Sequence, residues 1–232
     1  YEGLTIKADN ALKECDVIIG YTVYAELVKK YYPDKTFIVT PMKQEMQRCR
    51  IAYEQAAMGK KTAMVCSGDA GVYGMAGIMY ELNKDYTNVE LEIIPGVTAA
   101  LSGSSVLGAP LSHDFAVISL SDLLTPWELI AKRIECAAMS DMCISIYNPS
   151  SKKRHDYLHR ACEIILKYKN EDTVCGYVKN IGRDGEVYKI MTLKELSYEP
   201  TDMFTTVFIG NKDTKVINGK MVTPRGYKNI SL

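Results

Sequence analysis

The chain has 232 residues, enough to bury a sizeable core in one large or two small domains. Its 28 basic and 28 acidic side chains give a formal net charge of zero, which argues against nucleic acid or an acidic membrane surface as a partner. Seven cysteines without a C-x-x-C pair indicate small thiols in a reducing compartment. Because no apolar run is long enough to span a membrane and no signal-like segment is evident, we expect a soluble cytoplasmic protein.

Helices and strands alternate in the first half of the chain. This alternation is typical of a largely parallel sheet. The first expected element is a helix that no strand precedes, and Tyr1 is not a methionine, so we expect residues to be missing ahead of it. In chain order, the pattern predicts a helix over 4–15, a strand over 16–20, a helix that Pro33 closes, a strand over 35–40, a helix over 45–58, and strands over 61–66 and 88–94.

A glycine-rich loop follows the strand predicted over 61–66. Gly68 and Gly71 permit positive φ angles and close approach of a ligand to the main chain. Asp69 places an acceptor-only carboxylate at the entrance of a helix whose apolar period runs over 72–82. The pattern is equally typical of an ordinary strand-to-helix turn in which Ser67 or Asp69 caps the helix.

Small residues dominate 99–108, as in a helix packed closely against another backbone or lying beneath a ligand. A turn-rich break over 108–114 places the boundary between two lobes, residues 1–112 and 113–232. The second lobe is predicted to be mixed. Its expected elements are a strand over 115–120, a helix that Thr125 caps with Pro126 at its first position, a strand over 142–147, a helix over 152–168, a hairpin of strands over 173–179 and 187–191, a helical turn over 192–196 and a strand over 205–210.

Several strings resemble one known family. They are S-G-D-A-G-V-Y-G-M-A-G at 67–77, P-G-V-T-A-A at 95–100, S-L-S-D-L-L-T-P-W at 119–127, Y-N-P at 147–149 and K-N-x-G at 179–182. They are similar to motifs of the tetrapyrrole (corrin/porphyrin) methyltransferases, and in particular of the C17-methylating branch of cobalamin biosynthesis. The resemblance covers nearly the whole chain. It implies a two-lobed α/β fold with a largely parallel first sheet, a mixed second sheet and an active site between the lobes.

The resemblance also implies an activity. It is the S-adenosylmethionine-dependent methylation of precorrin-3B or cobalt-factor III at C17 with ring contraction, giving precorrin-4 or cobalt-precorrin-4, by a homodimer. The cofactor contacts carried over are Gly68, Asp69, Val72, Thr98, Ala99, Asn148 and Gly182. The family begins with a strand and a G-x-G-P-G loop that this sequence does not contain, so either the sequence is incomplete or cofactor binding is compromised. Alternatives are another methyltransferase of the same fold and a non-catalytic corrinoid-binding protein.

Methyl transfer from a sulfonium requires two reactants to be held in line and needs no nucleophilic residue. The implied small-molecule tetrapyrrole carries many carboxylates, and its proposed contacts are Ser121, Lys152 and Arg154, with Lys153, Lys179 and Arg183 as further cations. For any single one of these cations, surface solubility is the better explanation. Ring contraction needs proton movement, for which the candidates are His113, Asp122 and Tyr147, although His113 could simply orient its loop. His155 and His159 lie one helical turn apart without a third ligand, so no metal site is expected.

Overall fold

The computed structural model describes residues 2–151 and 153–227. It divides the chain between Thr98 and Ala99 into two compact units. In the first unit, a parallel sheet has the strand order β2-β1-β3, as the sequence pattern predicts. The elements of this unit are α1 (Ile6–Glu14), β1 (Val17–Tyr21), α2 (Thr22–Lys29), β2 (Thr36–Thr40), α3 (Glu45–Ala57), β3 (Thr62–Val65) and α4 (Ala76–Asn83).

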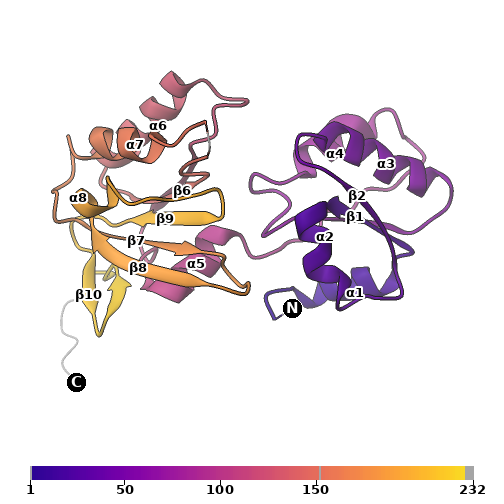
Figure 1. Cartoon of the computed structure of the whole chain (residues 1–232), viewed down its shortest axis with the longest axis horizontal. Coiled ribbons are helices and arrows are strands. Elements are labelled where there is room, and N and C mark those ends of the chain that lie inside the picture. The colour runs from indigo at the N-terminus through magenta and orange to yellow at the C-terminus, as the bar shows by residue number, and fades with distance from the viewer. Residues whose placement is uncertain (1, 152, 228–232) are drawn as a thin grey trace. The chain divides into compact units, whose positions relative to one another are not determined.

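Strand β1 lies in the middle of this sheet and is apolar on both faces. Its alternating side chains divide between two clusters, with Ile19 packing on the side of α3 and α4, and Ile18 on the side of α1 and α2 (Figure 1). A central parallel strand covered by helices on both faces requires such a continuous apolar run. The largest buried side chain of the α3 side is Tyr53, whose hydroxyl donates to the Met79 carbonyl at 2.8 Å.

The strand predicted over 88–94 is wrong. These residues alternate as a strand would, because Val89 and Leu91 pack towards α3 and α4 whereas Glu92 forms an ion pair of 2.5 Å with Lys7 of α1. However, they pair with no strand in the described part of the chain. A cavity of about 630 Å³ is lined by the segment 88–94, by residues 62–64 of β3 and by side chains of α3 and α4.

The second unit contains a mixed five-stranded sheet, as expected, with the order β5-β6-β9-β7-β8. Strands β5 and β6 are parallel, and the remaining neighbours are antiparallel, including the predicted hairpin of β7 and β8. The elements are α5 (Ala99–Leu107), β4 (Gly108–Ala109), β5 (Phe115–Ser119), α6 (Trp127–Met139), β6 (Cys143–Tyr147), α7 (Tyr157–Ile165), β7 (Val174–Lys179), β8 (Val187–Thr192), α8 (Leu193–Leu196), β9 (Thr205–Ile209), β10 (Lys215–Ile217) and β11 (Lys220–Val222).

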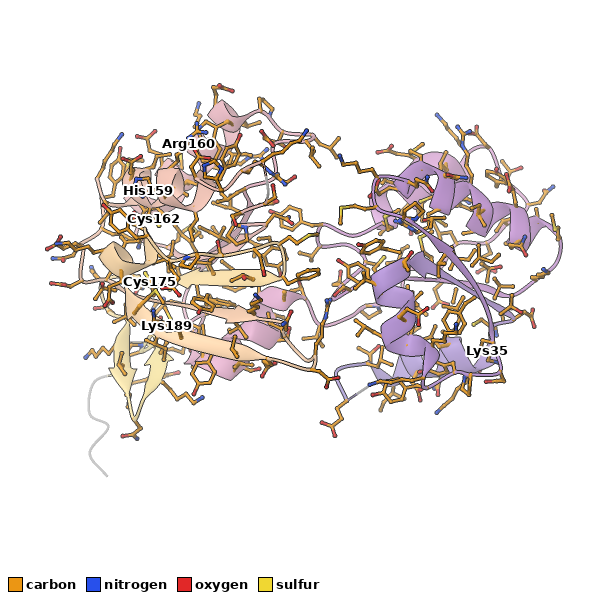
Figure 2. The ribbon with its side chains drawn as sticks, viewed as in Figure 1. Lys35, His159, Arg160, Cys162, Cys175 and Lys189 are labelled. Atoms are coloured by element: carbon orange, nitrogen blue, oxygen red, sulfur yellow. The ribbon has the colours of Figure 1, made fainter. Side chains whose placement is uncertain are left out.

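Helices cover both faces of this sheet. The main cluster joins α6, α7 and α8 to one face, and α5 packs on the other (Figure 1). Cys162 of α7 and Cys175 of β7, both labelled in Figure 2, belong to this cluster and are fully buried. A Cβ on Gly103 would lie 2.8 Å from the Phe208 ring, so α5 needs a small residue there to approach β9. The small-residue stretch therefore forms a helix packed closely on a sheet.

The structure also shifts several predicted boundaries. Helix α5 and strand β4 belong to the second unit, whereas the sequence placed the boundary after residue 112, because α5 packs against β7, β8 and β9 and β4 pairs with β11. Pro126 is the residue before the first turn of α6, which begins at Trp127, so Thr125 is not its cap. Helix α7 begins at Tyr157 and not at 152, and α4 begins at Ala76 and not at 72.

A short hairpin of β10 and β11 was not predicted from the sequence. Its turn is Asn218-Gly219, and both residues have positive φ angles, 49° and 74°. Asn-Gly between two short apolar runs is a strong hairpin signal.

Within the described residues, no helix has the length and apolar character needed to cross a membrane.

Candidate functional site

The glycine-rich loop between β3 and α4 is held together by Asp69. One oxygen of its carboxylate accepts from the Gly71 amide at 2.8 Å, and the other accepts from the Gly96 amide at 2.9 Å. The Val72 amide donates to the Asp69 carbonyl at 3.3 Å, and Gly68 has a φ of 77°. The carboxylate thus joins the loop after β3 to the Pro95–Gly96 segment, which lies far along the sequence.

Two glycines in this region are required by close backbone approach. A Cβ on Gly96 would lie 2.0 Å from the Gly68 carbonyl oxygen, and a Cβ on Gly74 would lie 2.4 Å from the Ala70 carbonyl oxygen. Neither neighbour is a flexible side chain, so the backbone itself would have to move. The sequence pattern indicated Gly68 and Gly71 but not Gly74 and Gly96, because the contacts that require these two glycines depend on how backbone segments meet in the folded chain.

The hydrogen bonds to Asp69 also affect its protonation. Donation by the Gly96 amide, and then by the Gly71 amide, holds the pKa of this carboxyl below its ordinary value. The group is therefore an ionised acceptor near neutral pH and is a poor proton donor there.

In the second unit, three strand ends meet at one edge of the sheet. Strands β5 and β6 are parallel, and β7 runs in the same direction because both β6 and β7 are antiparallel to β9. Asn148 follows β6 with a φ of 52°. Its side-chain Nδ2 donates to the hydroxyl of Ser119, at the end of β5, at 3.0 Å. Gly182 follows β7 with a φ of 66°, and its amide donates to Glu186 at 2.7 Å.

Tyr147 positions the start of α5 at this same edge. The Ala100 amide donates to the Tyr147 hydroxyl oxygen at 2.6 Å, so the side chain supplies an acceptor to the first turn of a helix that begins at Ala99. This contact joins Tyr147 to Ala100, the residue after the predicted Ala99 and 47 positions away in sequence. Thr98 is the last residue of the first unit.

Asp122 lies in a cluster of cations and aromatic rings. The Tyr157 hydroxyl donates to its carboxylate at 2.6 Å, and an Arg154 nitrogen lies 3.4 Å from the other carboxylate oxygen. The guanidinium of Arg160, labelled in Figure 2, stacks on Trp127 at 4.0 Å from the ring centroid. The hydrogen bond from Tyr157, with smaller help from Arg154 and Arg160, holds the pKa of Asp122 below its ordinary value. Sequence analysis missed Tyr157 and Arg160.

The remaining predicted substrate-binding and catalytic residues make separate contacts or are exposed. The Ser121 amide donates to the Ser119 hydroxyl at 3.2 Å, which links it to the β5 and β6 strand ends. His113 and Lys153 are exposed, and Lys152 lies outside the described residues. Lys179 forms an ion pair of 2.7 Å with Asp202, and Arg183 lies over the Phe204 ring.

Of the two histidines, His159 lies on α7 and has protein partners, whereas His155 precedes the helix and is exposed. Nδ1 of His159 lies 2.8 Å from the Ser197 hydroxyl and 3.0 Å from its carbonyl, and Nε2 lies 3.8 Å from Glu163. Over the residues that the structure describes, no group of three or more His, Cys, Asp or Glu side chains is arranged to hold a metal ion.

Both units thus present small-residue loops at the carboxyl edge of a sheet, where ligands bind in open α/β folds. The chain is therefore an α/β protein of two units, and the loops at the strand ends of each unit offer main-chain amides and carbonyls as hydrogen-bonding groups. The model of the family Tetrapyrrole (Corrin/Porphyrin) Methylases matches residues 1–197. The chain belongs to this family.

Similar proteins agree with this membership. A relative from Salmonella typhimurium, the probable cobalt-factor III C(17)-methyltransferase, is 46% identical over 97% of this chain and 93% of its own length. The crystal structure of the methyltransferase CobJ has a TM-score of 0.88 and 32% identity, covering 97% of this chain and 95% of that one. A uroporphyrin-III C-methyltransferase from Thermus thermophilus, complexed with S-adenyl homocysteine, has the same fold with a TM-score of 0.69 and 21% identity, covering 90% and 91%.

The residues present fit an adenosyl cofactor. Gly68 is exposed in the loop at 67–74, and nothing lies within 4 Å of an ideal Cβ on Gly182. Amides, carbonyls and hydroxyls at these strand ends suit the hydrogen-bonding groups of a nucleoside. The amino-acid portion of such a cofactor carries a carboxylate, for which main-chain amides and cations are suitable partners.

Proposed function

We propose that this chain transfers a methyl group from S-adenosylmethionine to C17 of a corrin precursor, precorrin-3B or cobalt-factor III, with contraction of the ring to give precorrin-4 or cobalt-precorrin-4. The observation that carries this proposal is the pairing of two features. One is the Asp69-tied glycine loop in the first unit, and the other is the S-L-S-D-L-L-T-P-W segment whose Asp122 is held by Tyr157 and Arg154 in the second. The 46% identity to a relative with a C17-methyltransferase name supports it.

When bound, the cofactor supplies a methyl group on an electrophilic sulfonium, so the protein has to bind and orient the reactants. In the first unit, Gly68, Asp69, Val72 and Thr98 are the proposed cofactor residues. Asp69 acts by fixing the loop, because both of its oxygens already accept from backbone amides. In the second unit, the proposed cofactor residues are Ala99, Asn148 and Gly182.

The proposed substrate contacts are Ser121 and Arg154, with Lys152 as a further cation. An arginine suits a carboxylate-bearing tetrapyrrole because its planar fork donates two parallel hydrogen bonds. Arg154 is oriented by the Ser151 hydroxyl, to which its Nε donates at 3.1 Å. The Arg154 side chain is thus oriented by Ser151 and Asp122 in the absence of a ligand.

For the proton movements of ring contraction, His113, Asp122 and Tyr147 remain the proposed groups. The lowered pKa of Asp122 supports a role as an ionised acceptor rather than as an acid. The Tyr147 oxygen accepts from Ala100, which supports a positioning role for its phenol. A cytoplasmic location is also part of the proposal, and the seven free cysteines support it because they indicate a reducing compartment. A homodimer is proposed as well, and light scattering after gel filtration tests it.

The deciding experiment is mass spectrometry after anaerobic incubation with S-adenosylmethionine and, in parallel, cobalt-factor III or precorrin-3B. A gain of one methyl group on either tetrapyrrole is the expected result, and the substrate that gains it identifies the route. No gain on either one, with S-adenosylhomocysteine still bound, would refute the C17 assignment in favour of another substrate. Failure to bind the cofactor product would refute the methyltransferase assignment for this chain.

A further inference from the structure

Arg48 is a buried cation without a carboxylate partner among the residues that the structure describes. It lies in the first turns of α3, and only 4% of its surface is exposed. Among the described residues it forms no ion pair with a carboxylate. Glu45, three residues before Arg48 on α3, accepts instead from the Lys43 amide at 3.2 Å. Burying a charge without a counter-charge is costly, so such an arginine calls for an explanation.

The partners that Arg48 does have are neutral. Its Nε donates to the Thr40 hydroxyl at 2.8 Å, and its Nη2 donates to the Pro41 carbonyl at 3.0 Å. Its Nη1 is 4.0 Å from the Met75 sulfur, which is a weak acceptor. A guanidinium has five N–H groups, so these contacts orient the fork and leave donors on both Nη atoms for a further acceptor.

The position of Arg48 is the second observation. Three neighbours of Arg48 lie at or after the carboxyl ends of the three strands. Thr40 is the last residue of β2, and Met75 ends the loop that follows β3. Tyr21 is the last residue of β1, and the centroid of its ring lies 5.9 Å from the guanidinium carbon. The three strands are parallel, so their carboxyl ends meet at one edge. That edge is where ligands bind in open α/β sheets. The partners of the Nη atoms are less buried than Thr40, because Pro41 is exposed and Met75 is half-buried, so the Nη end of the fork lies towards the less buried side of this edge.

We propose that Arg48 is a carboxylate-binding residue of the first unit, prepared by Thr40 and Pro41 to receive an anionic group of a ligand at the edge of the sheet. The inference rests on the proposed function, because both ligands of that reaction carry carboxylates: the amino-acid portion of the cofactor and the acidic side chains of the tetrapyrrole. A carboxylate there would supply the missing counter-charge and accept from the Nη donors. The neutral partners keep the guanidinium in place when no ligand is bound.

The test measures binding of S-adenosylhomocysteine and of cobalt-factor III by anaerobic calorimetry to three full-length proteins: the wild type, Arg48→Met and Arg50→Met. Arg50 lies on the same helix and is exposed, so its substitution removes an equal charge without touching the edge of the sheet. We expect Arg48→Met to weaken one of the two ligands by about 10- to 100-fold, the loss typical of a hydrogen bond to a charged group, and Arg50→Met to leave both unchanged.

The outcomes are distinct. Weaker S-adenosylhomocysteine binding alone identifies the cofactor as the source of the carboxylate, and weaker cobalt-factor III binding alone identifies the tetrapyrrole. Unchanged affinities in a folded Arg48→Met protein would overturn the inference while leaving the proposed function intact. A wild type that binds neither ligand would overturn both. If Arg48→Met does not fold, Arg48→Lys replaces it: this variant keeps the charge but loses the fork, and unchanged affinity in it would equally overturn the inference.

Discussion

Substituting Gly96 by alanine should disrupt the first unit at the point where its two loops meet. The added Cβ would lie 2.0 Å from the Gly68 carbonyl oxygen, 3.0 Å from the carbonyl carbon and 3.3 Å from the Asp69 Cα. All three atoms are backbone, so the loops must separate. Separation removes the hydrogen bond of 2.9 Å from the Gly96 amide to the Asp69 carboxylate.

The size of the effect follows from these two changes. Overpacking costs about 1–3 kcal/mol, and a hydrogen bond to a charged group is worth about 1.5–3 kcal/mol. We therefore expect a loss of about 2.5–6 kcal/mol, a large fraction of the stability of a typical domain. If the loops separate locally instead, the same free energy appears as weaker binding of S-adenosylhomocysteine.

The assay is urea unfolding with two probes, together with calorimetry of S-adenosylhomocysteine binding. The single tryptophan, Trp127, lies in the second unit, so its fluorescence follows that unit, whereas far-UV circular dichroism follows both. The matched control is Gly77→Ala in α4, where nothing lies within 4 Å of the added Cβ and the helix gains from alanine. A Gly96→Ala protein with the wild-type dichroism transition and wild-type affinity would refute the reasoning.

Three further predictions follow from the hydrogen bonds at the site. Asp69→Asn should flatten the pH dependence of the free energy of unfolding. The folded-state pKa of Asp69 is lowered, so the stabilisation by its carboxylate is complete above the ordinary pKa near 4 and is lost as the pH falls through the folded-state pKa. If the urea midpoint of the variant fell between pH 7 and 2 as steeply as that of the wild type, this prediction would be contradicted. Tyr157→Phe should raise the pKa of Asp122 towards its ordinary value, measured by NMR titration of the carboxyl, and an unmoved titration would rule out the phenol as the cause. Tyr147→Phe should leave the Ala100 amide without its acceptor and lower the free energy of unfolding by about 1–2 kcal/mol in urea, whereas an unchanged midpoint would mean that water replaces the hydroxyl.

Local patterns were sufficient to predict most of the fold. The alternation of helices and strands in the first half indicated the parallel sheet, and the turn at 180–186 between two strand-like segments indicated the hairpin of β7 and β8. The segment 88–94 shows the limit of this reasoning. Its alternation shows which side chains are buried, but pairing requires a neighbouring backbone, and that is a non-local property.

The candidate site was predictable in its residue types and less so in its contacts. Asp69 stood out beside two glycines, yet its tie to Gly96 joins residues 27 positions apart and depends on the tertiary fold. Arg48 gave no signal, because a charged residue on an amphipathic helix is ordinarily exposed and only the structure shows it buried. Tyr157 was expected inside a helix, and its contact with Asp122 spans 35 positions.

The place of β9 has a consequence for how the second unit is made. This strand is fully buried at the centre of the five-stranded sheet, between β6 and β7, yet it comes near the end of the chain. Until residue 209 has left the ribosome, β6 and β7 each have an unpaired inner edge, and such edges promote association with other chains. The sheet is therefore completed late, through contacts between distant segments, which makes folding slow. A nascent chain that stops before β9 should be a substrate for chaperones rather than a partly working enzyme.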